Sequence, residues 1–327
     1  MFHRYSFHSK LLVSMSDAHK RIVVKSTPKN TKERTLVDVC KLSADIRKAG
    51  PMLSLIELDG NTGVRSKRVY DLAIEHNVPL KLTSAPILIH QLEAALDRGL
   101  QLVPEVDLFL LDDKADGSRK HLRAVVRVIQ KANVKKLSFW LRAGKFMILN
   151  EGLANAVTLE ELTLWRPDTF DANKVDNYVE KLSTITSLPK LRALTFKSGF
   201  EGVSGSEYNS YGDAQITVFH KWLHWFETCE LEELNLETVH GDVNSTYLAL
   251  GRNKMLRAWS IRNATTTNMK EQGTDLAAAI AVSLSLRKIY IRFGAYIKDL
   301  DTHFAVAHEM AHKKGVELAV TCTENKF

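Results

Sequence analysis

The pattern with the clearest chemical content is His308-Glu309-Met-Ala-His312, close to the carboxyl end of the sequence. Residues four apart lie on one face of a helix, so both imidazoles could bind one Zn²⁺. Glu309 could then activate a zinc-bound water to hydrolyse a peptide bond. We keep a zinc metallopeptidase that uses His308, Glu309 and His312 as an alternative function. The main interpretation predicts a non-enzymatic protein with no metal and no other cofactor.

The residues around this pattern favour an outer helix rather than a catalytic cleft. Phe304, Ala307 and Ala311 follow helical spacing and form the expected buried stripe. Gly315 stands where metzincin peptidases carry a glycine, but the position of their third ligand is Leu318. A second histidine pair, His220 and His224, lies among Trp222, Trp225 and Phe226, and this spacing is typical of the packed face of a helix.

A phrase Leu-x-x-Leu-x-Leu recurs between these helical stretches about every 25 to 30 residues. Its clearest copies lie at 159–164, 191–196, 231–236, 256–261 and 286–291. Further strands are expected at 22–24, 53–58, 80–82, 106–110, 134–139 and 316–320. Self-similarity at such a period predicts a solenoid of about 10–11 repeats rather than one globular core.

Helical periodicity fills the intervals between the expected strands. The predicted helices lie at 64–77, 86–98, 118–133, 173–187, 213–229, 272–285 and 298–314, with Pro86 and Asp213 as helix-start signals. Each repeat therefore reads as strand, loop, helix and loop. The predicted fold class is an α/β solenoid shaped as a horseshoe, with a parallel sheet on the concave face and helices on the convex face.

These features resemble the ribonuclease-inhibitor-like class of leucine-rich repeat proteins. That class carries Asn or Cys just after the strand, whereas this chain has Pro167, Gly199, Val239 and Ala264 there, so we expect no polar ladder. The resemblance to intracellular adaptors with such repeats implies protein binding. The leucine-rich substrate receptors of ubiquitin ligases have an F-box segment before the repeats, and here the repeats begin near residue 22.

The predicted organisation has three parts. Residues 1–19 form a flexible basic tail or a targeting segment, residues 20–323 form the repeat domain, and residues 324–327 form a tail. A Gly- and Ser-rich loop insertion near 199–212 brings Tyr208 and Tyr211 to the surface as contact candidates. At the amino end, a mitochondrial presequence, an alternative start at Met15 and a disordered tail remain open.

Charge and cysteine usage restrict the class of partner. The net charge is +7, but residues 1–40 hold eight Lys/Arg against three Asp/Glu, so the remainder carries only +2. A nucleic-acid binder would carry a basic stripe on its folded surface, so we expect no nucleic acid. No apolar run is long enough to span a membrane. Three isolated cysteines indicate an intracellular, most simply cytoplasmic, location.

Binding residues are expected between the leucines, because side chains alternate across a strand. The predicted partner-binding residues on the concave face are Lys136, Trp140, Glu161, Trp165, Arg166, Lys197, Glu233, Asn235, Glu237, Arg262, Lys288, Tyr290 and Arg292. Trp140 and Trp165 hold equivalent positions in adjacent repeats and match the composition of interaction hot spots. The predicted function is a monomeric scaffold or adaptor for a protein partner, or a member of a hetero-complex. An assembly factor or subunit of an organellar complex is a further alternative.

Overall fold

The computed structural model describes most of the expected strands and helices. The described residues are 12–16, 21–25, 39–49, 53–59, 67–86, 89–109, 126–140, 153, 156–165, 183, 185–197, 213–237, 243–264, 266 and 268–323. The chain divides into two compact units, Met1–Trp140 and Leu141–Phe327. Both units are of the α/β class, with parallel strands that alternate with helices.

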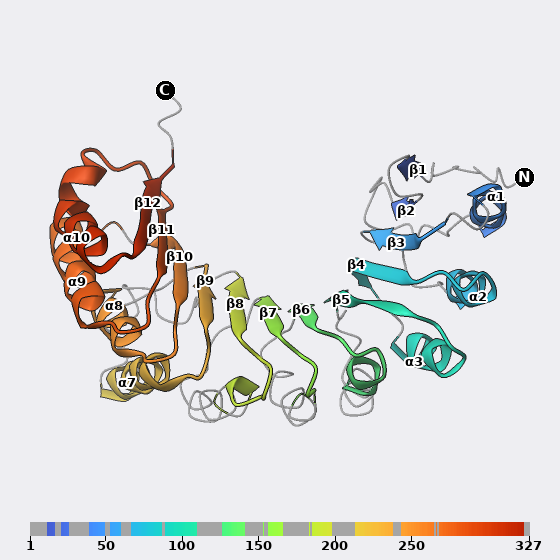
Figure 1. Ribbon diagram of the computed structural model, residues 1–327, viewed down its shortest axis with the longest axis horizontal. Coiled ribbons are helices and arrows are strands. Elements are labelled where there is room, and N and C mark those ends of the chain that lie inside the picture. Colours follow the sequence, from blue (N-terminus) through green and yellow to red (C-terminus); the bar gives the residue numbers. More distant parts are fainter. Residues whose placement is uncertain are drawn as a thin grey trace, which may run out of the picture. The chain divides into compact units, whose positions relative to one another are not determined.

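The first unit contains a sheet whose described strands pair in sequence order. Its elements are β1 (Leu12–Ser16), β2 (Arg21–Lys25), α1 (Val39–Ala49), β3 (Leu55–Asp59), α2 (Lys67–Glu75), β4 (Leu80–Pro86), α3 (Ile89–Asp97), β5 (Leu102–Phe109), a helical segment over 126–131 and β6 (Lys136–Trp140). β1 pairs antiparallel with β2, and β2 to β6 are parallel. Figure 1 shows α2 and α3 side by side on one side of β4 and β5.

The second unit repeats the same plan with longer helices. Its elements are β7 (Glu161–Trp165), β8 (Ala193–Lys197), α7 (Asp213–Thr228), β9 (Glu233–Leu236), α8 (Val243–Arg252), β10 (Ala258–Ala264), α9 (Met269–Val282), β11 (Lys288–Phe293), α10 (Leu300–Lys314) and β12 (Glu317–Cys322). The strands β7 to β12 pair in parallel and in sequence order. The helices α7 to α10 lie together on one side of the strands (Figure 1).

The core of the second unit lies between its strands and helices. The repeated leucines and their equivalents point to the helices and are at most 2 % exposed: Leu162, Leu164, Leu194, Phe196, Leu234, Leu236, Trp259, Ile261, Ile289 and Ile291. Aromatic pairs join the two layers. Trp259 of β10 stacks on Tyr247 of α8 at 5.7 Å between ring centroids, and Phe293 of β11 meets Phe304 of α10 at 5.7 Å.

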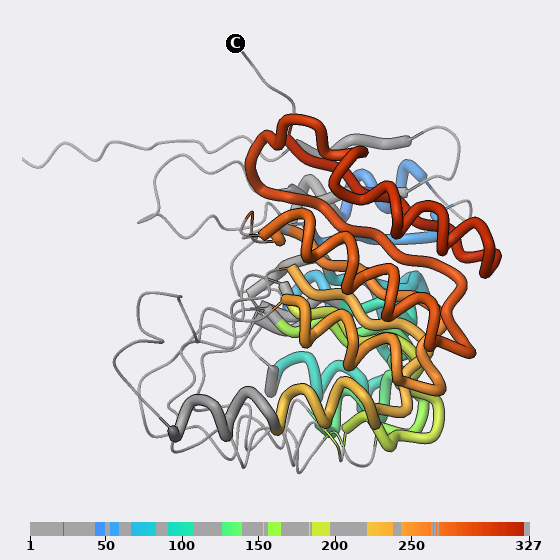
Figure 2. Tube along the Cα trace, turned by 90° about the vertical axis from the view of Figure 1, so that its left-hand side faces the viewer, coloured from blue at the N-terminus to red at the C-terminus, as the bar shows by residue number. Residues whose placement is uncertain are grey.

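Two glycines allow the helices of the second unit to pack closely. A Cβ at Gly251 of α8 would lie 2.5 Å from the carbonyl oxygen of Ala279 in α9. A Cβ at Gly273 of α9 would overlap the carbonyl oxygen of His303 in α10. Figure 2 shows α8, α9 and α10, coloured from yellow to red, stacked in order. Any larger residue at these positions would force neighbouring helices apart.

Paired backbone hydrogen bonds join successive strands at their amino ends. The carbonyl oxygen of Arg192 accepts hydrogen bonds from the amides of Glu232 and Glu233 at 2.8 and 2.9 Å. The carbonyls of Glu160, Glu232 and Arg257 each accept two amides of the next strand in the same way. Because this pattern returns at each junction, it fixes the register of the sheet from β7 to β11.

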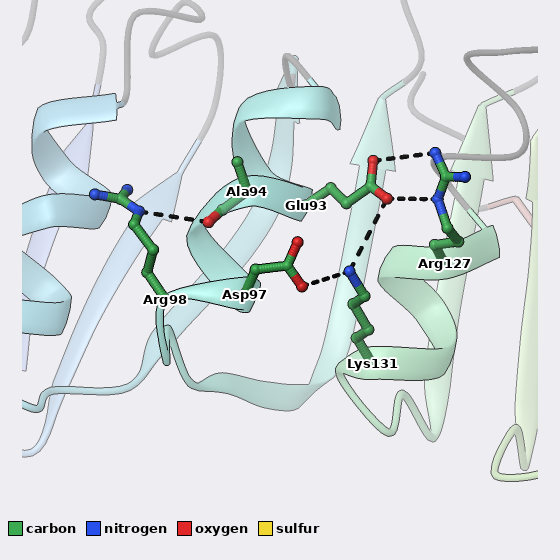
Figure 3. A network of polar contacts seen from close by, with 6 residues as sticks. All are labelled: Glu93, Ala94, Asp97, Arg98, Arg127 and Lys131. Atoms are coloured by element: carbon green, nitrogen blue, oxygen red, sulfur yellow. Dashed lines mark hydrogen bonds and ion pairs between the residues drawn. The ribbon is translucent and has the colours of Figure 1, made fainter.

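Ion pairs join neighbouring helices on the outside of the first unit. Figure 3 shows Glu93 and Asp97 of α3 facing Arg127 and Lys131 of the next helical segment. Lys131 Nζ lies 2.5 Å from Asp97 Oδ1, and Arg127 forms a two-pronged pair with Glu93. Each exposed pair contributes little to stability, typically below about 1 kcal/mol. The pairs connect the same faces of successive repeats.

The strand predictions are confirmed, because every predicted strand position overlaps a parallel strand. The helix prediction at Pro86 is wrong: Pro86 ends β4 and α3 begins at Ile89. β1, α1 and α8 were not predicted at all, although β1 lies within the proposed tail over 1–19. The insertion near 199–212 and the tail at 324–327 lie outside the described residues. The horseshoe shape stays a prediction.

Candidate functional site

The candidate site is the open face of the second unit, defined as the side of β7 to β12 that points away from α7 to α10. The register places three rows of residue positions across this face. The first row is Glu161, Ala193, Glu233, Ala258, Lys288 and Glu317. The middle row is Thr163, Thr195, Asn235, Ser260, Tyr290 and Ala319. The third row, at the carboxyl ends of the strands, contains Trp165, Lys197, Arg262, Arg292 and Thr321.

The middle row is a connected set of polar side chains. Ser260 Oγ donates to Asn235 Oδ1 at 2.5 Å, and Asn235 Nδ2 donates to Glu233 Oε1 at 2.7 Å. The same nitrogen lies 3.4 Å from Thr195 Oγ1. These contacts fix the orientation of the Asn235 amide. A ligand on this face would therefore meet a polar surface that is already ordered, which lowers the entropy cost of binding.

The carboxylates of the first row have partners within the sheet. Glu161 pairs with Arg192 at 3.3 Å, and Glu317 pairs with Lys288 at 3.0 Å. Glu233 accepts the hydrogen bond from Asn235. At this row, Glu161 and Glu317 therefore have basic partners, whereas the partner of Glu233 is a neutral amide.

The third row contains a different arrangement of charge. Arg262 and Arg292 are direct register partners on β10 and β11, and both are exposed. Within the described ranges, neither guanidinium has a carboxylate partner. Tyr290, one pleat earlier on β11, is half-buried, and its hydroxyl lies 3.4 Å from Thr321 Oγ1. This end of the face is basic and aromatic.

The structure brings together most of the predicted binding residues of the second unit. Glu161, Glu233, Asn235, Arg262, Lys288, Tyr290 and Arg292 lie on the open face, and Glu237 directly follows β9. Lys136 lies in β6 of the first unit, where it pairs with Glu105 at 3.7 Å. Trp140, Trp165 and Lys197 are described only by their backbone positions at strand ends, so the tryptophan prediction stays a prediction. Arg166, Tyr208 and Tyr211 lie outside the described residues.

The His-Glu-x-x-His pattern lies on α10. Phe304, Ala307 and Ala311 form its buried stripe, as expected. Glu309 is exposed and accepts a hydrogen bond from Lys313 at 2.6 Å, and this contact lowers the pKa of its carboxyl group. A lowered pKa makes Glu309 a weaker general base. His308 is half-buried and His312 is exposed.

Among the residues that the structure describes, the surroundings of the two histidines contain no complete metal site. No group of three metal-ligating side chains occurs in the part of the chain that the structure describes. Gly315 adopts a left-handed conformation with φ of 66° and ends α10, where the amide of Val316 donates to the carbonyl of Ala311. The end of the helix therefore explains why a glycine stands at position 315, without any metal site.

The aromatic cluster of α7 belongs to the core. Trp222, Trp225 and Phe226 are at most 6 % exposed, and Phe196 of β8 meets both tryptophans at 6.3 to 6.4 Å. The interpretation of this stretch as a packed helix face is confirmed. His224 lies on the exposed side of the same helix.

Sequence reasoning missed one buried polar side chain, Asn253. Its Nδ2 donates to the carbonyls of Phe226 and Cys229 at 2.8 and 3.0 Å, and its Oδ1 accepts the amides of Met255 and Leu256 at 2.7 and 2.9 Å. The expectation of no polar ladder concerned the positions that follow the strands, whereas Asn253 lies in the turn that precedes β10. The Leu-x-x-Leu phrase begins three residues after Asn253, and this spacing is the signal that could have found it.

Ser283 holds the same position in the next repeat, where its hydroxyl accepts the amide of Leu286 at 3.2 Å. In earlier repeats the backbone makes this bond, because the amides of Leu159 and Leu191 donate to the carbonyls of Ala156 and Leu188. The turn before each of these strands therefore has the same hydrogen bond with different acceptors.

Comparison with known proteins gives no family assignment. No protein-family model matches the chain, and no curated protein matches it. Among the helices of the described ranges, none combines the length and apolar composition needed to cross a bilayer.

Proposed function

We propose that this chain is a non-enzymatic leucine-rich repeat protein of the ribonuclease-inhibitor-like class, and that it binds a protein partner. The parallel strands, the outer helices and the period of about 25 to 30 residues support the class. The partner would contact the open face of the second unit. Within the described residues, the helices lie only on the opposite side of these strands.

The observation that carries the proposal is the ordered polar surface of the open face. Asn235 is held by Glu233, Thr195 and Ser260, and Tyr290 is the register partner of Ser260 on the same row. Half-buried tyrosine and exposed arginine are the residue types enriched among binding hot spots. The proposal includes an intracellular location, which the isolated cysteines support: Cys229 and Cys322 are both free thiols.

Affinity purification of the tagged full-length chain from its host, followed by reconstitution with the purified partner, tests this proposal. Replacing Tyr290 by Ala should weaken the reconstituted complex by about 2 kcal/mol, or roughly 30-fold in Kd. The matched control is Lys270→Ala on the exposed side of α9, which should leave affinity within about twofold.

Hydrogen exchange on the complex supplies a second readout. Protection should concentrate in β9, β10 and β11. If Tyr290→Ala binds as tightly as the unmodified chain and protection lies only on α8 to α10, the partner uses the helical side and the proposal is wrong.

A further inference from the structure

Arg262 and Arg292 form a pair of like charges that the fold places side by side. They are register partners on adjacent parallel strands, which lie about 4.8 Å apart. Both are exposed, and no carboxylate among the described residues pairs with either of them. We call these two residues the arginine pair.

The arginine pair differs from the neighbouring charges. Lys288, two rows away on β11, pairs with Glu317 at 3.0 Å, and Arg192 lies close to Glu160 and Glu161. Like charges directly opposite each other in a sheet are destabilising. The two arginines therefore repel each other, whereas Lys288 and Arg192 have carboxylate partners.

A β-bulge directly follows the arginine pair. Arg262 opposes Arg292, but the next pair is Ala264 with Phe293, so β10 contains one extra residue at position 263. Bulges bend a strand and change the direction of neighbouring side chains, and they are frequent beside functional sites. Tyr290 and Ser260 lie one pleat earlier, and their hydroxyls contact Thr321 and Asn235. Ordered hydroxyl groups thus border the arginine pair.

We propose that the arginine pair is the docking site for an acidic segment of the protein partner. A guanidinium binds a carboxylate through two parallel hydrogen bonds, so two arginines suit two carboxylates. Carboxylates at i and i+4 of a helix, about 5 to 6 Å apart at Cβ, match the strand spacing. This inference rests on the proposed function and names the chemistry of the partner.

The charges around the pair favour an acidic protein segment over nucleic acid. Glu233 and Glu161 lie on the same face, and Glu317 lies on the next strand. A phosphate chain that crossed the sheet would meet these carboxylates, whereas nucleic-acid binders present a continuous basic stripe. A short acidic segment can contact the arginine pair alone.

Fluorescence anisotropy with the full chain tests the proposal. The probe is a fluorescein-labelled peptide containing Glu-Glu-Asp-Glu-Glu between Gly-Ser ends, and the comparison probes are its Gln/Asn analogue and a uridine oligonucleotide. R262E/R292E should weaken binding of the acidic peptide at least tenfold. R262K/R292K should lie between this variant and the unmodified chain, because lysine cannot form the two-pronged pair.

The matched control is K254E/K270E, which makes the same change of charge at two exposed lysines outside the three rows, in the turn before β10 and in α9. It should leave peptide binding within about twofold, and circular dichroism should show that all variants are folded. Equal losses in the two Glu variants, equal binding of the Gln/Asn analogue, or tighter pair-dependent binding of the oligonucleotide would each overturn the proposal. If Tyr290→Ala weakens binding of the purified partner but R262E/R292E does not, acidic docking fails and the proposed function stands.

Discussion

Removal of the Asn253 side chain should be among the most destabilising changes in the second unit. Asn253 is 1 % exposed and joins α7, the turn before β9 and the turn before β10 through four short hydrogen bonds. In Asn253→Ala, the carbonyls of Phe226 and Cys229 and the amide of Leu256 lose these partners inside the protein. A buried polar group without a partner costs about 1 to 3 kcal/mol.

The Phe226 carbonyl keeps a weak contact with the Cys229 thiol at 3.8 Å, so the Cys229 carbonyl and the Leu256 amide carry most of an expected loss of about 2 to 3 kcal/mol in the free energy of unfolding. The amide of Met255 is less buried, so water can replace that bond. Urea denaturation, followed by tryptophan fluorescence, measures the loss, because Trp222 and Trp225 pack against Phe226.

The informative comparison is Asn253→Ser, because Ser283 holds the equivalent position one repeat later and accepts the amide of Leu286. Serine should restore the acceptor for Leu256 but not the donor for the two carbonyls, so about 1 kcal/mol of stability should return. A loss below about 1 kcal/mol in Asn253→Ala, or identical losses in both variants, would refute this reasoning.

Three further predictions concern packing, ionisation and the histidine pattern. Gly273→Ala should lower the free energy of unfolding by about 1 to 3 kcal/mol, because its methyl group would overlap the carbonyl of His303; an unchanged urea midpoint would contradict this. Burial raises the pKa of Cys229 from 9.0 to about 12, so the folded state favours the neutral thiol and stability is lost as pH rises above 9. Between pH 8 and pH 10 the free energy of unfolding should fall by about 1.4 kcal/mol more in the unmodified chain than in Cys229→Ala, as measured by urea denaturation. Equal losses in the two proteins would contradict this prediction. Glu309→Gln should leave the thermal midpoint and any zinc-dependent peptide hydrolysis unchanged, because Glu309 is exposed and paired with Lys313; a loss of such hydrolysis would revive the peptidase alternative.

The strands could be predicted from the sequence because the apolar positions of the repeated phrase are buried side chains of the sheet. Leu234 and Leu236, for example, are 0 and 1 % exposed, and the phrase at 231–236 identifies both. The same alternation predicts which residues share the open face. It predicts that Arg262 and Arg292 lie on this face, and the structure pairs their positions directly on β10 and β11.

The missed elements have no such phrase. α8 contains Asn244, Ser245 and Thr246, which are weak helix formers, and tertiary packing of Tyr247 on Trp259 stabilises it instead. Asn253 was missed although it stands three residues before the phrase at 256–261, because the two carbonyls that its Nδ2 binds, Phe226 and Cys229, belong to the preceding repeat. Pro86 was misplaced because proline is acceptable at a strand end as well as in a first helical turn.

The paired hydrogen bonds at the starts of the strands make the junctions between repeats interchangeable. Removal of residues 257–286, one full period, would join Leu256 to Arg287 and bring the carbonyl of Glu232 to the amides that Arg257 now serves. Gain or loss of whole repeats during evolution would therefore preserve the bonding at the junction. Insertion or deletion of a single residue at the start of a strand would instead shift its register and turn its leucines toward the open face. Variation among descendants of this chain should accordingly occur in whole periods or in the loops between elements.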